Sequence, residues 1–470
     1  MPHQTAECKA TSIIVLTHNQ LTYTQACIDS IRKHTSDTPY EIIIVDNHST
    51  DGTPEWLSQQ SDIRTIFNDD NRGFPTGCNQ GIEIAKGEAI LLLNNDTVVT
   101  ENWLTLLLDC LYSEPSIGAV GPVTNNCSNY QTIPVSYPSL LEMQLFAGQY
   151  NQRDPDKWER RLKLVGFCML IKRSIVDEIG LLDERFSPGN FEDDDYSLRI
   201  LQAGYQLILC KNVFIHHFGS TSFKTNPEQY RRLLHDNEKK FTDKWGFGPT
   251  SNTTIRYDLL GLMDTTLSAD KQPMRILDIN CACGGTLLQI KTQYPHAELY
   301  GVAKSPSEGK IASQFSKISD GGLESIEYPY DFFDYIFLGD VLQNVMDPWE
   351  LLERARKYLK NNGKLIASIP NVMYVDVLKR LIQGEWSYGG KQEWLYGGES
   401  GIPRDQVRFY SLQEIDRMFI NAGYASRFYT GIVAALSDES SKWVEQFGRM
   451  SMMANTDQFK VTHYLVKAMR

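Results

Sequence analysis

The sequence predicts an α/β protein made of two domains in tandem. Short apolar runs alternate with helical patterns through the first half of the 470-residue chain, and a second series of the same kind begins near residue 274. One hydrophobic core rarely serves a chain of this length, because domains average about 150 residues. We therefore expect a first domain over 1–245, a linker over 246–272 and a second domain over 273–470.

Each element of the first domain follows from its own pattern. Four apolar runs predict buried strands of a largely parallel sheet, at residues 11–17, 40–47, 63–67 and 88–96. Between the first two runs, residues with the spacing of an amphipathic helix recur at Leu21, Thr24, Ile28 and Ile31. The charged stretch 226–245 predicts a closing helix, and residues 246–254, GFGPTSNTT, have the composition of a linker.

The second domain repeats the alternation of strands and helices. Strands are predicted at residues 274–280, 297–303, 334–342 and 363–371, and the stretch 285–294 between the first two predicts a helix. The two halves share this class of fold without sharing motifs.

Composition and charge exclude several classes of protein. The net charge is −12, and Lys and Arg are scattered, so we expect no nucleic-acid partner. No run approaches the roughly 20 apolar residues of a membrane span, and the first ten residues lack the pattern of a secretion signal. Nine cysteines without CxxC spacing fit a reducing compartment. We expect a cytoplasmic protein; docking at the inner face of a membrane and a homodimer stay open.

Polar residues end three of the predicted strands. Ligands of open α/β sheets bind beyond the carboxyl ends of the strands, so these residues are candidates for a site. Asp46 can accept hydrogen bonds from a base edge, and Gly52 permits a turn that brings backbone close to a ribose. Asp96 can bring a hard cation to a diphosphate. Taken singly, such residues are equally well explained as helix caps and turn formers.

Taken together, THN (17–19), VDNHSTDGT (45–53), NRGF (71–74) and LLLNNDT (91–97) resemble the family 2 glycosyltransferases of the GT-A fold. The resemblance spans about residues 11–245 and implies a nucleotide-sugar-binding domain. It assigns the nucleoside to Thr17, Asn19, Asp46 and Asn47, and the border of the nucleotide sugar to Arg72 and Gly73. The family's Asp-x-Asp site would be formed by Asn94, Asn95 and Asp96, with Asn94 at its first acidic position.

Downstream motifs continue the resemblance. In FEDDDYSLRILQAGY (191–205), Asp193 matches the family's catalytic base, which deprotonates the acceptor, with Glu192 and Asp194 on the acceptor or sugar side. Adjacent acids repel one another, and a helix starting nearby would partly offset this. The alternative is a solvated acidic turn. His217 takes the family's metal-ligand position beside Asp96, and His216 is expected to be a packing residue.

The second half resembles class I S-adenosylmethionine-dependent methyltransferases, over about residues 274–430. The resemblance rests on ILDINCACGG (276–285), DYIFLGDVLQNVMDPWELL (334–352), NNGKLIASIPNV (361–372), GEWSYG (384–389) and VRFYSLQEI (407–415). It implies a Rossmann-like fold. The chain departs from the family pattern at the Gly-rich turn, at the ribose carboxylate and at the active site, with Asn280, Ala282, Ala303, Gln343, Asn344 and Gln406. We therefore expect no S-adenosylmethionine binding.

The resemblances imply an inverting transfer from a nucleotide diphosphate sugar, with UDP as the expected nucleotide and Mn or Mg neutralising the diphosphate. The acceptor would be a glycan or a protein, in bacterial surface polysaccharide or flagellin glycosylation. Two alternatives stay open: a bifunctional glycosyltransferase and methyltransferase, and a binding scaffold without chemistry. For the second domain we favour a retained fold that serves acceptor binding, dimerisation or a protein partner.

Overall fold

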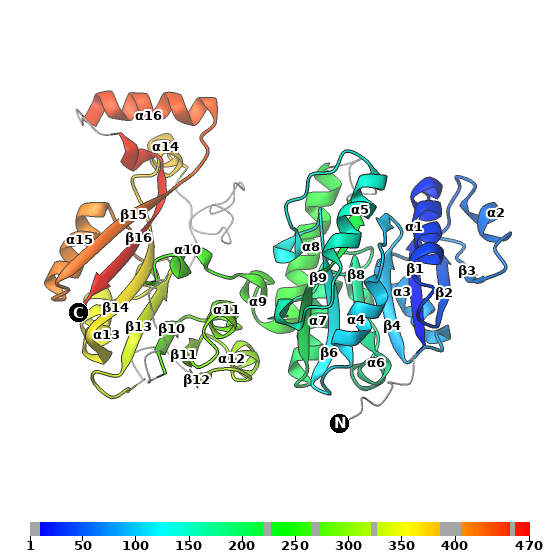
Figure 1. Ribbon diagram of the computed structural model, residues 1–470. Coiled ribbons are helices and arrows are strands. Elements are labelled where there is room, and N and C mark those ends of the chain that lie inside the picture. Colours follow the sequence, from blue (N-terminus) through cyan, green and yellow to red (C-terminus); the bar gives the residue numbers. More distant parts are fainter. Residues whose placement is uncertain (1–9, 220–226, 265–272, 321–326, 386–405, 452–455) are drawn as a thin grey trace. The chain divides into compact units, whose positions relative to one another are not determined.

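The structure is a computed structural model that describes residues 10–219, 227–264, 273–320, 327–385, 406–451 and 456–470 (Figure 1). The chain divides into two compact units between Thr253 and Thr254. Most of the GEWSYG motif, residues 386–389, lies outside the described residues. Among the described helices, none is both long and apolar enough to cross a membrane.

The four strands predicted for the first half are parallel neighbours in one sheet. They are β1 (Thr11–Thr17), β2 (Tyr40–Asp46), β3 (Ile63–Phe67) and β4 (Ala89–Asn94). β1 pairs in parallel with β2 and β4, and β2 with β3, so the predicted parallel arrangement is confirmed. Five further strands follow: β5 (Thr97–Val98), β6 (Ile117–Thr124), β7 (Trp158–Arg161), β8 (Cys168–Lys172) and β9 (Gln206–His217). The strand order is β3-β2-β1-β4-β8-β6-β9-β5, with β7 paired to β9 (Figure 1).

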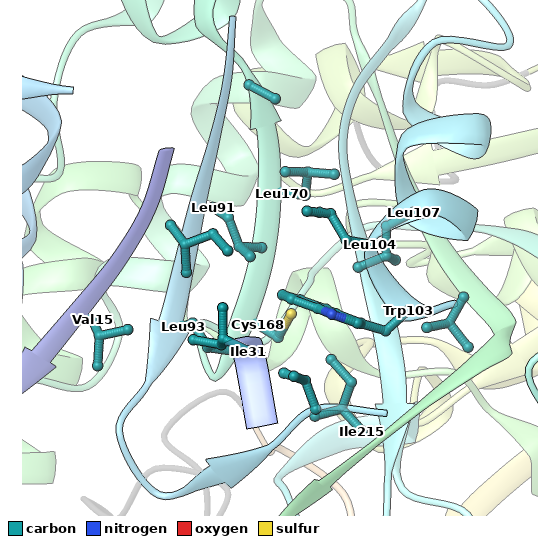
Figure 2. Close-up of a cluster of buried hydrophobic side chains, with 14 of the residues drawn as sticks. Val15, Ile31, Leu91, Leu93, Trp103, Leu104, Leu107, Cys168, Leu170 and Ile215 are labelled. Atoms are coloured by element: carbon teal, nitrogen blue, oxygen red, sulfur yellow. The ribbon is translucent and has the colours of Figure 1, made fainter. Parts of the chain in front are cut away.

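Helices bury the apolar residues of this sheet. They are α1 (Leu21–His34), α2 (Thr53–Leu57), α3 (Phe74–Ile84), α4 (Trp103–Leu111), α5 (Leu140–Tyr150), α6 (Arg173–Ile179), α7 (Glu192–Gln202), α8 (Pro227–Trp245) and α9 (Thr250–Thr253), with 3-10 turns η1 (Asn129–Gln131), η2 (Pro155–Lys157) and η3 (Glu184–Phe186). Figure 2 shows the indole of Trp103 among aliphatic side chains of the sheet and of α4. Trp103 is fully buried, and its Nε1 donates to Thr35 Oγ1 at 3.1 Å.

Helix α8 closes the first domain, as its charged pattern predicts. Its last turn is fastened to α7, because Lys244 Nζ lies 2.5 Å from Asp195 Oδ1 and Trp245 Nε1 donates to the same oxygen at 3.0 Å. Earlier in α8, Asn237 Nδ2 donates to the carbonyls of Phe186 and Gly189 at 2.8 and 2.9 Å. The helix thereby fixes the loop that precedes the four acidic residues.

The second domain has a seven-stranded sheet in the order β12-β11-β10-β13-β14-β16-β15. Its strands are β10 (Arg275–Ile279), β11 (Glu298–Ala303), β12 (Lys317–Asp320), β13 (Phe333–Gly339), β14 (Leu359–Pro370), β15 (Ser426–Val433) and β16 (Val461–Met469). Its helices are α10 (Tyr257–Leu260), α11 (Gly285–Gln293), α12 (Pro306–Ala312), α13 (Pro348–Tyr358), α14 (Val375–Gln383), α15 (Leu412–Asn421) and α16 (Asp438–Ser451), with 3-10 turns η5 (Leu342–Asn344) and η7 (Asp457–Phe459). The strands from β12 to β14 pair in parallel, while β16 joins β14 and β15 in antiparallel, and the Rossmann-like prediction is confirmed.

The segment that the sequence assigns to a linker contributes to the second core. Ile255, Leu259, Leu260 and Met263 are buried in a cluster with residues of β10, β11 and α11. Their spacing places them on one side of a helical turn, so they pack with the sheet instead of spanning open solvent. Residues 254–264 are therefore part of the second domain.

Candidate active site

The ends of β1 and β2 lie side by side and carry the residues expected at the nucleoside. Thr17 is in register with Asp46. The Thr17 and Thr24 hydroxyls are 2.9 Å apart, and Asn95 Nδ2 donates to Thr24 Oγ1 at 3.0 Å. Asn19 Oδ1 accepts from the Thr50 backbone N–H at 2.7 Å, which joins the two strand ends.

Asp46 keeps one carboxylate oxygen available. Its Oδ2 accepts from the backbone N–H of Ser49 at 3.1 Å, whereas its Oδ1 is buried without a hydrogen-bond partner. A buried acceptor without a donor is costly, so a native structure that keeps one calls for an explanation. A ligand N–H, such as that of a base edge, would satisfy this oxygen.

The side chain of Asn47 is engaged by the protein at both ends. Its Nδ2 donates to the Gly73 carbonyl at 3.1 Å, and its Oδ1 accepts from Asn68 Nδ2 at 2.7 Å. Asn47 thus holds the NRGF loop against the second strand. Its side chain can influence a nucleoside chiefly by placing this loop.

The NRGF loop makes a close turn at Gly73. The φ angle there is +84°, and a Cβ atom would lie 2.7 Å from the Cα of Pro188, so only glycine fits. Arg72 lies at the surface, and its Nε is 3.2 Å from Asp70 Oδ1. Arg72 is therefore free to change partners when an anion arrives, because exposed ion pairs are weak.

Asn94, Asn95 and Asp96, at the end of the fourth strand, have different hydrogen-bond partners. The Asn94 backbone N–H donates to the Phe167 carbonyl at 2.9 Å, and Asn95 bonds to Thr24 as above. Asp96 is buried, and its Oδ1 lies 3.1 Å from Nε2 of His217. Of the three, Asp96 is the residue whose carboxylate meets a second metal-binding side chain.

The hydrogen bonds of His217 define what this pair can bind. Nδ1 lies 2.6 Å from the carbonyl oxygen of Asn126, which can only accept, so Nδ1 carries a proton. In a neutral ring, Nε2 is then an acceptor that faces the acceptor Oδ1 of Asp96. A proton or a cation between them resolves this opposition. A backbone carbonyl on the second ring nitrogen is the usual support of a metal-bound histidine.

These two side chains fit a divalent cation that is shared with a ligand. Within the described residues no cluster of three or more His, Cys, Asp and Glu side chains could hold a metal. A carboxylate and an imidazole leave several positions for the oxygens of a diphosphate and for water. The site is thus suited to a cation that arrives with its ligand.

His216 packs into the domain, as the sequence predicts. Its Nδ1 lies 2.7 Å from the hydroxyl of Tyr137, and its ring contacts that of Phe218 at 4.6 Å between centroids. Burial, with a smaller contribution from His217, lowers the pKa of His216 to about 4. Its role in the structure is packing.

Asp193 lies at the start of α7, facing the backbone of the segment before β8. Its Oδ2 accepts from the Gly166 N–H at 3.0 Å and its Oδ1 from the Asp194 N–H at 2.9 Å. These bonds fix the carboxylate while its side chain keeps 13% exposure, which leaves it within reach of a ligand. A fixed, partly exposed carboxylate is the arrangement that a general base requires.

The acids on either side of Asp193 have strongly perturbed protonation. Burial, and next the charge of Asp193, raise the pKa of Glu192 to about 8. Burial also raises the pKa of Asp194 to about 7, although Lys163 opposes it. Glu192 is therefore mainly protonated at neutral pH. The repulsion expected between adjacent acids is reduced because one of them is neutral.

Two residues connect the base to the cation pair. Gly166 donates its N–H to Asp193, and the ring of the next residue, Phe167, stacks on His217 with centroids 5.2 Å apart. The Phe167 carbonyl also accepts from the Asn94 N–H. Gly166 and Phe167 thus link α7, β4 and β9 into one site.

Several residues of this site carry no recognisable signal in the sequence. Asn125 Oδ1 accepts from the His217 N–H at 2.8 Å, and Asn126 orients the ring. Lys163 lies 2.5 Å from Asp194 and 3.7 Å from Asp193. Their partners are at least 30 residues away in the chain, so only the fold reveals them.

The turn after β10 lacks two of the glycines expected at a cofactor site and keeps Gly284, where φ is +84°. Asn280 and Ala282 have φ angles of +69° and +50°, the left-handed region that favours glycine. Asp278 is buried beside them, and burial raises its pKa to about 7. The second parallel strand ends in Ala303, which offers no carboxylate. The backbone of the turn therefore has the left-handed conformation expected of glycines, but two of its residues carry side chains.

Arg256 lies at the carboxyl edge of this second sheet. It comes from the segment before α10, and its Nη1 lies 2.7 Å from Asp340 Oδ2, just after β13. Its Nη2 donates to Asp258 Oδ2 at 2.7 Å and to Ser368 Oγ, on β14, at 2.8 Å. Burial disfavours its charge, but Asp340 and Asp258 outweigh this and raise its pKa. The chain thus places its own cation between two central strands.

The three active-site departures of the second domain differ in their contacts. The backbone carbonyl of Gln343 accepts from the Val407 and Arg408 N–H groups, while its side-chain Oε1 is buried without a hydrogen-bond partner. Gln406 Nε2 donates to the Arg408 carbonyl at 3.0 Å. Asn344 Nδ2 donates to the Asp340 carbonyl at 3.2 Å. These residues tie the segment after residue 405 to η5.

Comparison with known proteins decides the family. Residues 12–180 match the sequence profile described as glycosyl transferase family 2. The first domain is a family 2 glycosyltransferase. Residues 252–427 match the profile of a methyltransferase domain, so a methyltransferase fold follows the glycosyltransferase domain. This second match begins before α10, in agreement with the packing of that segment.

Two curated relatives resemble the glycosyltransferase part. The chain is 29% identical over 241 residues to the uncharacterised protein y4gI of Sinorhizobium fredii, covering 47% of this chain but 26% of y4gI. It is 26% identical over 230 residues to an N-acetylglucosaminyl-diphospho-decaprenol L-rhamnosyltransferase of Mycobacterium tuberculosis, covering 43% of this chain and 73% of that enzyme. The chain therefore spans about a quarter of the first relative.

Among solved structures, the family 2 glycosyltransferase resembles the mannosyltransferase PcManGT from Pyrobaculum calidifontis, in complex with GDP-Man and Mn2+. The identity is 19%, the alignment covers 52% of this chain and 68% of that chain, and the TM-score is 0.37.

Proposed function

We propose that the first domain transfers a sugar from a nucleotide diphosphate sugar, with inversion, in the presence of Mn or Mg. The observation that carries this proposal is the convergence of Asp96 and His217 Nε2, with His217 Nδ1 committed to a carbonyl. Two facing acceptors in a buried site are compatible with a cation. The bound cation would neutralise the charge that develops on the leaving diphosphate.

The residues of this chain supply the remaining steps. Asp46 Oδ1 accepts from the base, and the turn at Gly73 brings backbone close to the nucleotide sugar. Asp193 accepts the proton of the acceptor hydroxyl while the new bond forms between that oxygen and the anomeric carbon. The bond from the anomeric carbon to the diphosphate breaks on the opposite face, so the configuration is inverted.

We propose UDP as the nucleotide and a glycan or protein acceptor in bacterial surface polysaccharide or flagellin glycosylation. The name of the Mycobacterium tuberculosis relative describes a decaprenol-linked acceptor, which supports a lipid-linked glycan. Such an acceptor would place the protein in the cytoplasm at the inner face of the membrane. The second domain would serve acceptor binding or a homodimer.

A donor screen tests this function. The full chain is incubated with UDP-, GDP-, dTDP- and CDP-sugars, each with Mn, with Mg or with a chelator, and thermal stability and nucleotide release are measured. We expect one nucleotide class, UDP, to raise the Tm only when metal is present. An Asp96→Asn variant is the matched control and should lose this metal-dependent rise. If no nucleotide sugar changes the Tm, the scaffold alternative holds instead.

A further inference from the structure

Four carboxyl groups occupy the first turn of α7, and one lysine lies beside two of them. Lys163 Nζ is 2.5 Å from Asp194 Oδ2 and 3.7 Å from Asp193 Oδ1, and its side chain is 11% exposed. Burial disfavours the charge of Lys163, yet Asp193 and Asp194 outweigh it and raise the lysine pKa. Lys163 therefore stays charged in a place where an unpaired cation would be costly.

The backbone around Lys163 is held against the same helix. Leu164 donates its N–H to Ser197 Oγ at 3.2 Å, and Gly166 donates its N–H to Asp193 Oδ2 at 3.0 Å. Between them, Val165 donates to Gln131 Oε1 at 2.7 Å. The segment 163–166 thus runs along the start of α7. It places the Lys163 charge beside Asp194 and the Gly166 N–H on Asp193.

We propose that Lys163 is a positioning residue for the base: its charge keeps the Asp193 carboxylate ionised and anchored on the Gly166 N–H while the adjacent acids remain buried. The proposal rests on the proposed transfer reaction. Lys163 acts through Asp194 and Asp193; within the described part of the chain its ion pairs do not involve the donor-side residues Asp46, Gly73 or Asp96. Its loss should therefore affect proton transfer more than donor binding.

The groups that surround Asp193 define the pH dependence to expect. On its own helix, Glu192 and Asp194 act on it as like charges when they ionise. From the segment before β8, Lys163 provides the opposing charge. From the loop after β6, the Cys127 thiol also faces this group, and burial raises the pKa of that thiol to about 11, so it is neutral. Lys163 is thus the cation that opposes the carboxylates.

The test compares Lys163→Met with Lys163→Arg. In Lys163→Met the acid limb of the kcat profile should move to higher pH by about one to three units, because an opposite charge within 4–6 Å shifts a carboxyl by that amount. The donor KM should change less than about threefold, and Lys163→Arg should restore the profile.

Lys211→Met is the matched control, since the ion pair of Lys211 is to Glu159 on β7, at 2.8 Å, and not to an acid of α7. Its profile should follow that of the wild type. If Lys163→Met fails to fold, Lys163→Gln removes the same charge and keeps a polar end that can donate to Asp194. An unchanged acid limb in a folded variant without Lys163 would overturn the proposal, even where the Tm falls.

A second readout separates this proposal from the proposed function. Carbon NMR of labelled aspartate carboxyls, with the Asp193 signal assigned from its absence in Asp193→Asn, needs no turnover. The signal should titrate at higher pH in Lys163→Met than in the wild type. If the titration moves but no sugar is transferred, the lysine proposal stands and the transfer reaction fails. If it does not move, the lysine proposal fails.

Discussion

Four consecutive acidic side chains begin α7, and the fold gives each a different environment. Asp195 is fully buried and pairs with Arg199 and Lys244 at 3.0 and 2.5 Å. Asp194 pairs with Lys163, and Glu192 keeps a buried oxygen without a partner. Asp193 is left as the partly exposed one. The four acids therefore have four environments: two ion pairs at Asp195, one ion pair to a lysine at Asp194, a buried carboxyl at Glu192 and the candidate base at Asp193.

Replacing Asp193 with Asn should abolish sugar transfer while donor binding stays nearly intact. The amide is isosteric and can still accept from the Gly166 N–H, but it no longer takes a proton. The loss in kcat should be about 10²- to 10⁴-fold, the range of general-base catalysis. Steady-state kinetics and donor titration calorimetry measure the two quantities separately.

Asp195→Asn is the matched comparison two residues away. It weakens the ion pairs to Arg199 and Lys244, so it should lower the Tm more than Asp193→Asn, which loses one of two N–H···O bonds. Wild-type turnover in Asp193→Asn would contradict the assignment of the base.

Asp96→Ala and His217→Ala should each weaken donor binding in Mn by at least about tenfold, because both surround the proposed cation. The effect should vanish in a chelator, where the wild type also lacks the cation. Calorimetric titration of the donor, with and without Mn, measures this. A partly exposed acid of the same domain, Asp109, which pairs with Arg153, provides the control variant Asp109→Ala. Unchanged metal-dependent binding in both site variants would refute the metal pair.

At the residue scale, the position of a candidate side chain can be predicted from the sequence where it lies at the end of a strand. Asp46 and Asp96 follow apolar strands, and the structure places both at the carboxyl edge of the sheet. The partner of Asp96 could be proposed only through the family resemblance, since His217 is 121 residues away. The hydrogen bonds of the Asn47 side chain could not be predicted from the sequence, because its partners Asn68 and Gly73 lie more than 20 residues away in the chain.

At the scale of the element, two buried carboxyl groups in the first turn of α7 make the free energy of unfolding depend on pH. Glu192 has a folded pKa of about 8 against an ordinary value of 4.5, mainly through burial. Its stabilising contribution is complete below the ordinary value and is lost as the pH rises through 8. Asp194, raised from 3.8 to about 7, acts in the same direction.

We therefore expect the Tm of the wild type to fall between pH 5 and pH 9, and that of Glu192→Gln to fall less. The amide imitates the protonated acid at every pH. A difference of about 1 kcal/mol corresponds to roughly 2–4 °C for a domain of this size. Differential scanning calorimetry across the pH range measures it, and parallel curves for the two proteins would argue against a buried, titrating Glu192.

Elements with continuous apolar patterns could be predicted from the sequence, and amphipathic ones could not. β1 to β4 are found within two residues of the predicted runs, because strands buried on both faces need apolar side chains throughout. β7, with the sequence WERR, pairs at the sheet edge and carries three charged residues. Its place depends on its partner β9, which no local pattern reveals.

At the scale of the whole molecule, the second domain should not bind S-adenosylmethionine. Asn280 and Ala282 add side chains to a turn where backbone must approach the ligand, and Ala303 leaves the ribose hydroxyls without an acceptor. A missing partner for a buried hydroxyl costs about 1–3 kcal/mol. Arg256 is also held by Asp340 at the same sheet edge.

Calorimetry and thermal shift with S-adenosylmethionine and its demethylated product should give no response in the full chain. A metal-dependent shift with the sugar donor in the same preparation is the positive control. Deletion of residues 254–470 should impair stability, assembly or acceptor use. Micromolar binding of the cofactor would restore the bifunctional interpretation.

The burial of Ile255, Leu259 and Leu260 also determines where the gene can be cut without damage to the second domain. A gene fragment beginning at residue 273 would lack these side chains and the Arg256–Asp340 pair, and would leave an apolar surface on the sheet. A fragment beginning at Thr254 retains them. Recombination that exchanged this domain between genes would therefore conserve a working core only when the crossover preceded residue 254, inside the GFGPTSNTT stretch.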